Sequence, residues 1–255
     1  MMDELIHYLK ECEIETVDLD NLTLPAKKDG KHGLLVLPCY NLVEMLEEVF
    51  DEEESLTAYV HNQLAKVHSL SAEDAWRKIV ESQLYYTDLP ADQKNLDGKG
   101  FEGIYQAYKL IWEGHELLNE QLCEAETEPF ILNYSWIQSK IEDEDKKLIV
   151  LALSPESGFE APLWVPMGGF NECPLPEYQS VIMKHWQENY ETKALAVSDN
   201  TWVLQAGRKP STQEEALKLA KEHFMFCQYV LESYPTLGHY ADYLLKHDVW
   251  YFWWD

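Results

Sequence analysis

The chain has 255 residues and carries 46 acidic against 20 basic side chains, a formal charge of −26 at pH 7. Binding to phosphates needs a basic surface, and only Arg77 and Arg208 carry a guanidinium group, so the charge argues against direct binding of nucleic acid or of anionic membranes. It favours a basic protein partner, which it attracts at long range. A hydrophobic content of 46% with 9 Trp and 15 Tyr excludes a disordered chain.

The hydrophobicity of the chain, its first residues and its cysteines predict a cytoplasmic protein. No apolar stretch approaches the roughly 18 residues that span a bilayer, and the first residues are acidic where a signal peptide is basic and then apolar. The cysteines are odd in number, widely spaced and never in a Cys-x-x-Cys pair, which favours free thiols over disulfides or a zinc site. They are Cys12, Cys39, Cys123, Cys173 and Cys227. We expect no metal and no cofactor.

Residues 1–140 are predicted to form an acidic, mostly helical region, and residues 1–147 hold a charge of −19. Asp29-Gly30 supplies the positive φ of a tight turn, so a short hairpin is predicted there with Leu34–Leu37 as the returning strand. Apolar residues at helical spacing predict the helices that follow, one of them starting behind Ser71 with Asp74 as its capping-box acid. The predicted helices contain residues 5–12, 42–49, 56–64, 72–84 and 103–123.

The acidic run Asp51-Glu52-Glu53-Glu54 lies between two of these helices. Its carboxylates favour the N-terminus of the helix that follows, so it is interpreted first as a solvated loop. The alternative is a docking surface for a basic partner.

After a polar boundary at residues 141–147, strands and helices alternate. We predict strands over 148–153, 193–197, 201–205 and 249–254, and helices over 176–190, from about 213 and near 237–245. Ser211 or Thr212 is the expected cap of the middle helix, with Glu214 or Glu215 completing a capping box. The fold class is therefore α+β: a mainly helical acidic N-terminal region (1–140) with a short hairpin, then a C-terminal α/β sandwich-like domain (145–255) with a small mixed sheet.

The chain ends on Trp250-Tyr251-Phe252-Trp253-Trp254-Asp255. As a strand, this segment is apolar on both faces, which predicts that it is covered on both sides. The Asp255 side chain and the terminal carboxylate then meet at one place. They are structural or, alternatively, they line a recognition groove with Glu172 nearby.

Three segments carry a family resemblance: Gly168-Gly169-Phe170-Asn171-Glu172-Cys173-Pro174, the stretch from Glu214 through Glu222-His223-Phe224 to Cys227, and Tyr240-Ala241 with the terminal aromatics. Together they resemble the bacterial family of domain of unknown function 4253, over about residues 145–255. The family follows its second-motif cysteine with Pro-Asp, where this chain has Gln228-Tyr229. The resemblance implies a fold class and no established activity.

Catalytic candidates are few. Cys173 lies in a glycine-containing loop with Asn171 and Glu172, and a histidine such as His223 would activate its thiol. His223 and Cys227 share a helical face, four residues apart. For each, a packing role is the simpler interpretation, because aromatic residues flank the histidine and glycine permits a structural turn at the loop.

Two main functional hypotheses remain. The first is a non-enzymatic acidic protein-binding factor, such as a bacterial immunity or inhibitor protein that neutralises a basic toxin, using Asp51 to Glu54 and Asp255. The second is a cysteine/histidine-dependent hydrolase or transferase using Cys173, His223, Asn171 and Glu172. A DNA mimic is a weaker third. The sequence leaves the oligomeric state open.

Overall fold

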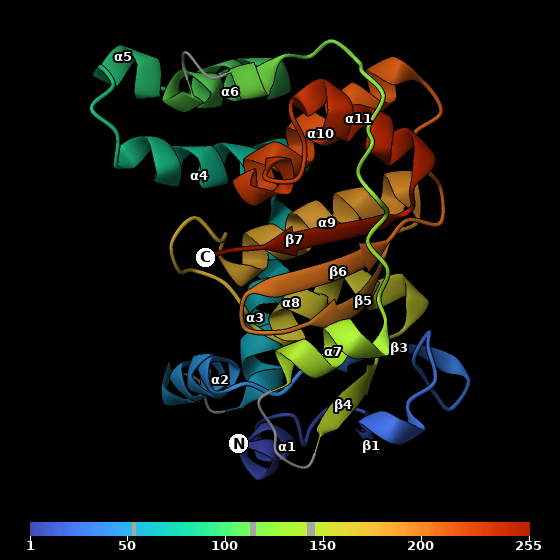
Figure 1. Cartoon of the computed structure of the whole chain (residues 1–255). Helices are drawn as coiled ribbons and strands as arrows, with labels where there is room; N and C mark the ends of the chain where they lie inside the picture. Colours follow the sequence, from blue (N-terminus) through green and yellow to red (C-terminus); the bar gives the residue numbers. More distant parts are fainter. Residues whose placement is uncertain (53–54, 113–115, 142–145) are drawn as a thin grey trace.

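An open, mixed β-sheet runs through the molecule and helices cover it (Figure 1). The computed structural model describes residues 1–52, 55–112, 116–141 and 146–255. The α-helices among them are α1 (Met2–Tyr8), α2 (Tyr40–Glu52), α3 (Leu56–Ser69), α4 (Ala72–Tyr85), α5 (Ala91–Lys94), α6 (Phe101–Lys109), α7 (Tyr134–Lys140), α8 (Ala161–Trp164), α9 (Pro176–Tyr190), α10 (Gln213–Phe226) and α11 (Leu237–Lys246). The strands are β1 (Ile14–Asp18), β2 (Lys27–Lys28), β3 (Lys31–Val36), β4 (Lys147–Ala152), β5 (Lys193–Val197), β6 (Thr201–Gln205) and β7 (Val249–Trp253).

The strand order is β1-β4-β3-β5-β6-β7, with β2 paired to β3. Only β3 and β5 run parallel among the described strands, with Leu35 opposite Ala196. The predicted α+β class, with a helix-rich N-terminal part and a mixed sheet, is confirmed.

The sheet takes its strands from both parts of the chain. β3, from the N-terminal part, lies between β4 and β5 from the C-terminal part, and β1 pairs with β4 at the edge. The sequence boundary near residues 140–145 therefore falls between two segments that share one sheet.

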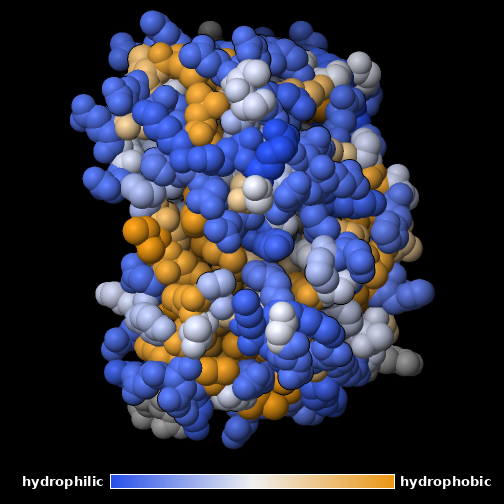
Figure 2. Space-filling model, turned by 90° about the vertical axis from the view of Figure 1, so that its right-hand side faces the viewer, coloured by the Kyte–Doolittle hydropathy of each residue, from blue (hydrophilic) through white to orange (hydrophobic). Residues whose placement is uncertain are grey.

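Alternate strand residues supply two separate cores. Leu34, Val36 and Trp202 face the large core beneath the helices, which include α2, α3, α4, α9 and α10. Leu35 and Val203 face a smaller core covered by α7 and by residues 19–26. Seen from the side, hydrophilic side chains cover most of the surface, and apolar side chains show between them in patches from the top to the bottom of the view (Figure 2).

Local signals place most elements correctly. Asp29 and Gly30 have φ values of 51° and 80° in the β2–β3 turn. Ser71 and Asp74 form the predicted capping box of α4. Thr212 caps α10 by accepting a hydrogen bond from the Glu215 amide, and the Glu215 carboxylate accepts one from the Ser211 amide.

The long helix predicted over 103–123 is wrong. Helix α6 ends at Lys109, and two 3₁₀ turns follow in the described residues, η2 (Leu110–Trp112) and η3 (Glu116–Leu118). The Asn119 carbonyl accepts from the Gly238 amide at 3.0 Å and its side chain accepts from the Gln121 amide. These contacts turn the chain away from a helical path into residues 119–133, which we call the strap. The strap runs along the sheet to α7 (Figure 1).

Candidate functional site

The glycine-containing loop of residues 168–175, here the 168–175 loop, is held from behind by one buried amide. Gln179, in the first turns of α9, is fully buried. Its Nε2 donates to the Met167 carbonyl at 2.6 Å and to the Pro174 carbonyl at 2.7 Å, while its Oε1 accepts from the Trp202 indole at 2.7 Å. The side chain thus ties both ends of the loop to the sheet.

Cys173 lies on the buried side of this loop. Its thiol contacts the Met167 sulfur and Gln179 Nε2, each at 3.6 Å. Burial raises the pKa of the Cys173 thiol well above its ordinary value, because the thiolate loses its solvation. The thiol is therefore neutral near pH 7, the opposite of an activated nucleophile.

His223 lies in the aromatic core with no exposed surface. Its Nδ1 forms a 2.7 Å hydrogen bond with the Tyr240 hydroxyl, and its ring packs edge-on against Trp186 and Trp250. Burial lowers the pKa of the imidazole well below its ordinary value, so the ring stays neutral. The Cys227 thiol donates to the Trp253 carbonyl at 3.1 Å.

Cys173 and His223 have different hydrogen-bond partners, so the structure does not give the thiol–imidazole pair that the enzymatic hypothesis needs. Cys173, Asn171 and Glu172 do line one hollow of about 660 Å³, but Cys173 is only 5% exposed and His223 is fully buried. Asn171 and Glu172, in contrast, lie on the outer side of the loop. Asn171, with φ 45°, donates through Nδ2 to the Asp255 carbonyl. Glu172 accepts from the Tyr229 hydroxyl at 3.3 Å.

A hollow of about 500 Å³ opens where the chain ends, and we call it the acidic hollow. The C-terminus and the 168–175 loop lie on one side of the molecule, above α2 (Figure 1). The carboxylates that line it are Glu44 and Glu48 of α2, Asp199 of the β5–β6 turn, and Asp255. Its remaining lining residues are Asn41, Met45, Gly168, Gly169, Phe170, Asn171, Asn200 and Trp254.

Hydrogen bonds hold the walls of the acidic hollow in place. Asn41 Nδ2 donates to Asp199 at 2.8 Å, and the Trp254 amide donates to the Asn200 carbonyl at 2.9 Å. None of the described residues that line the hollow is basic. The carboxylates therefore create a negative potential that no lining cation neutralises.

Helix α2 connects this hollow to the acidic run. Its apolar side, which includes Leu42 and Leu46, is buried, while Glu44 and Glu48 are exposed one turn apart. The helix continues to Glu52, and the side chains of Asp51, Glu52, Glu53 and Glu54 lie outside the described residues. The predicted docking role of that run stays a prediction.

Sequence reasoning named Asp255 but missed Glu44, Glu48 and Asp199. The i, i+4 spacing of the two glutamates on the polar face of a helix was a usable signal. Nothing local links that helix face to residue 255, because the sheet and the 168–175 loop bring them together.

A buried carboxylate was also missed. Glu222 is 1% exposed, accepts from the Trp186 indole at 2.9 Å, and lies 3.3 Å from Lys218 Nζ and 3.4 Å from His185 Nε2. These contacts tie α10 to α9. The arrangement is an interhelical anchor.

The described part of the chain contains no group of three or more His, Cys, Asp or Glu side chains placed to hold a metal ion. Within the same residues, no helix combines the length and the apolar character needed to cross a membrane.

A comparison with known proteins finds one protein family that matches part of the chain. No curated protein and no solved structure matches the chain. The family description, Domain of unknown function (DUF4253), names no activity. Its model matches residues 149–255, which include the 168–175 loop, α10 and the terminal strand. The C-terminal part of this chain is therefore similar to the family DUF4253.

Proposed function

We propose that the protein is a non-enzymatic protein-binding factor whose acidic hollow receives a lysine or arginine side chain from a basic partner. The observation that carries the proposal is the convergence of four side-chain carboxylates on one hollow without a lining cation. Carboxylates bind a cationic side chain through charge-assisted hydrogen bonds, which are stronger than neutral ones.

Both the net charge of the chain and the local charge of the hollow indicate a basic partner. The net charge of −26 draws a basic protein toward the surface, and the acidic hollow gives one of its side chains a defined position. A cytoplasmic bacterial immunity or inhibitor protein that covers a basic toxin fits both features.

The two alternative functions fit the geometry less well. A cysteine/histidine enzyme needs a thiolate next to a histidine, whereas Cys173 and His223 are buried with other partners. A DNA mimic needs carboxylates along an exposed ridge, whereas Glu44, Glu48, Asp199 and Asp255 line a hollow.

The test co-expresses the chain with the products of the neighbouring genes, and a basic product that co-purifies is titrated against the purified chain. We expect the double variant Glu44→Gln/Glu48→Gln to bind about tenfold more weakly and with a smaller dependence on salt, because two lining charges are lost. The matched control, Glu188→Gln/Glu214→Gln, removes two exposed charges from α9 and α10 and should bind within about twofold of the wild type. Equal weakening by both double variants, or no binding by the wild type, would contradict the proposal.

A further inference from the structure

Aromatic rings line a second hollow, on the side of β7 away from β6. Its volume is about 260 Å³, and we call it the aromatic groove. The rings come from the strap, η5 (Gln228–Leu231) and the segment after it, α11 and β7. They are Phe130, Tyr229, Tyr234, Tyr240, Tyr243, Tyr251 and Trp253.

The rings contact one another in three groups around the groove. Tyr229 lies 5.0 Å from Trp253, and Phe130 stacks on Tyr251 at 4.7 Å between ring centroids. Tyr234 packs against Tyr240 and Tyr243. Such packing fixes the rings before any ligand arrives, which lowers the entropic cost of binding.

Several of the tyrosine hydroxyls are already engaged. The Tyr229 hydroxyl donates to Glu172, and the Tyr243 hydroxyl donates to the Val249 carbonyl and accepts from the Phe130 amide. The Tyr240 hydroxyl is bonded to His223. A primary ammonium group brings three N–H donors that need acceptors, whereas most residues that line this groove offer aromatic rings, which suit a cation without N–H donors.

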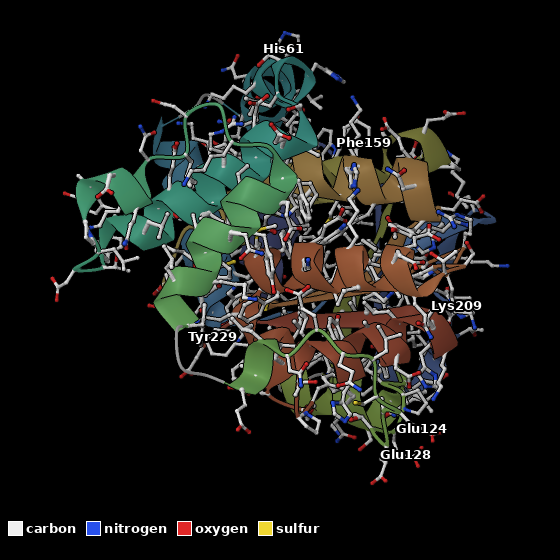
Figure 3. All side chains as sticks on the ribbon, turned by 90° about the horizontal axis from the view of Figure 1, so that it is seen from above. His61, Glu124, Glu128, Phe159, Lys209 and Tyr229 are labelled. Atoms are coloured by element: carbon white, nitrogen blue, oxygen red, sulfur yellow. The ribbon has the colours of Figure 1, made fainter. Side chains whose placement is uncertain are left out.

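A carboxylate among the lining residues favours a cation over a neutral apolar group as the ligand of the groove. Glu128 is the one charged residue among the described residues that line the groove. Seen from above, Glu128 lies at the margin of the molecule and Tyr229 lies well apart from it (Figure 3). Because most of the other lining residues are aromatic, the rings must provide most of the contact with a bound cation.

We propose that the aromatic groove binds a quaternary or fully methylated ammonium group of a small molecule. Aromatic rings attract such a group through their quadrupoles, and desolvation in a groove strengthens the attraction. The volume suits a headgroup of this size and is smaller than the usual site for a drug-sized ligand. The groove shares no lining residue with the acidic hollow, so either proposal can fail without affecting the other.

The experiment titrates the full chain with choline and follows the choline N-methyl proton signals by NMR. We expect a saturable upfield shift, because the methyl groups lie against ring faces. The neutral isostere, in which a tert-butyl group replaces trimethylammonium, should bind about fivefold more weakly or worse. Equal affinities, or no saturable upfield shift, would overturn the proposal.

Variants separate the ring contribution from a general loss of structure. Trp253→Leu and Tyr229→Leu should each weaken choline binding about fivefold, because each removes a ring. Tyr229→Phe keeps the ring and should bind as the wild type does. Tyr86→Leu is the matched control, since Tyr86 is an 86% exposed aromatic on the far end of α4. Unchanged binding by a folded Tyr229→Leu or Trp253→Leu variant counts against the site.

Discussion

Gly168 shows how one residue fixes the shape of the acidic hollow. Its φ is 140°, a conformation that residues with a Cβ rarely adopt, and it lies against the buried Gln179. A Cβ at this position would lie 2.3 Å from the Pro174 carbonyl oxygen and 2.4 Å from Gln179 Nε2. Both contacts are far inside van der Waals distance, so the 168–175 loop would have to move.

We therefore expect Gly168→Ala to lower the free energy of unfolding by about 2 to 4 kcal/mol, measured by urea denaturation. The control is Gly30→Ala in the β2–β3 turn, where φ is 80° but nothing lies within 4 Å of the added Cβ. That variant should lose only about 1 kcal/mol, because it carries the backbone strain without the clash. Similar losses in both variants would show that the close packing against Gln179 is unimportant.

At the scale of elements, the N-terminus of α10 is stabilised by a charge pair as well as by its cap. The Glu215 carboxylate lies 2.7 Å from Arg208 and accepts from the Ser211 amide at 2.7 Å. Arg208 and these hydrogen bonds lower the pKa of Glu215 from 4.5 to about 2. The folded state thus favours the ionised form more than the unfolded chain does.

This shift predicts a pH dependence. A lowered folded-state pKa stabilises the fold above pH 4.5, and that stabilisation is lost as the pH falls from 4.5 toward 2. Glu215→Gln should cost about 1 kcal/mol at pH 6, because the pair is partly exposed. The difference between wild type and variant should shrink toward zero by about pH 2 to 3 in urea denaturation. A difference that stays constant with pH would exclude an ionic origin.

At the scale of the whole molecule, the central position of β3 matters most. β3 pairs with β4 on one side and with β5 on the other, and Leu34, Leu35 and Val36 are fully buried in the two cores. The DUF4253 match begins within β4, at residue 149. In this chain the matched segment thus takes its central strand from outside itself.

We expect residues 146–255, expressed alone, to lack a cooperative unfolding transition by circular dichroism. Without β3, strands β4 and β5 lose their shared partner and leave unpaired edges, which favours aggregation. The full chain, measured in parallel, should unfold cooperatively. A fragment that unfolds cooperatively would instead show that the C-terminal part is an independent folding unit.

Particular residues show where sequence reasoning succeeded and where it ended. Ser71 and Asp74 lie three residues apart and Asp29 and Gly30 are adjacent, so their roles can be predicted without a structure. The helix predicted over 103–123 ends instead at Lys109, and Gly238, over a hundred residues away, holds Asn119 outside any helix. Asp255 lines the acidic hollow together with Glu44, Glu48 and Asp199, which sequence reasoning did not identify, whereas Glu172, expected nearby, lines another hollow. The recognition role of Asp255 stays a prediction.

The sequence by itself determined the charge, the apolar periodicities, the caps and turns, and the family resemblance of the C-terminal part. Each of these depends on composition or on residues close together in the chain. Only the tertiary structure decided that β3 enters the C-terminal sheet, that Cys173 and His223 are buried apart, and that carboxylates and aromatic rings gather in separate hollows. These features depend on strand pairing and burial between distant segments, which short-range patterns do not specify.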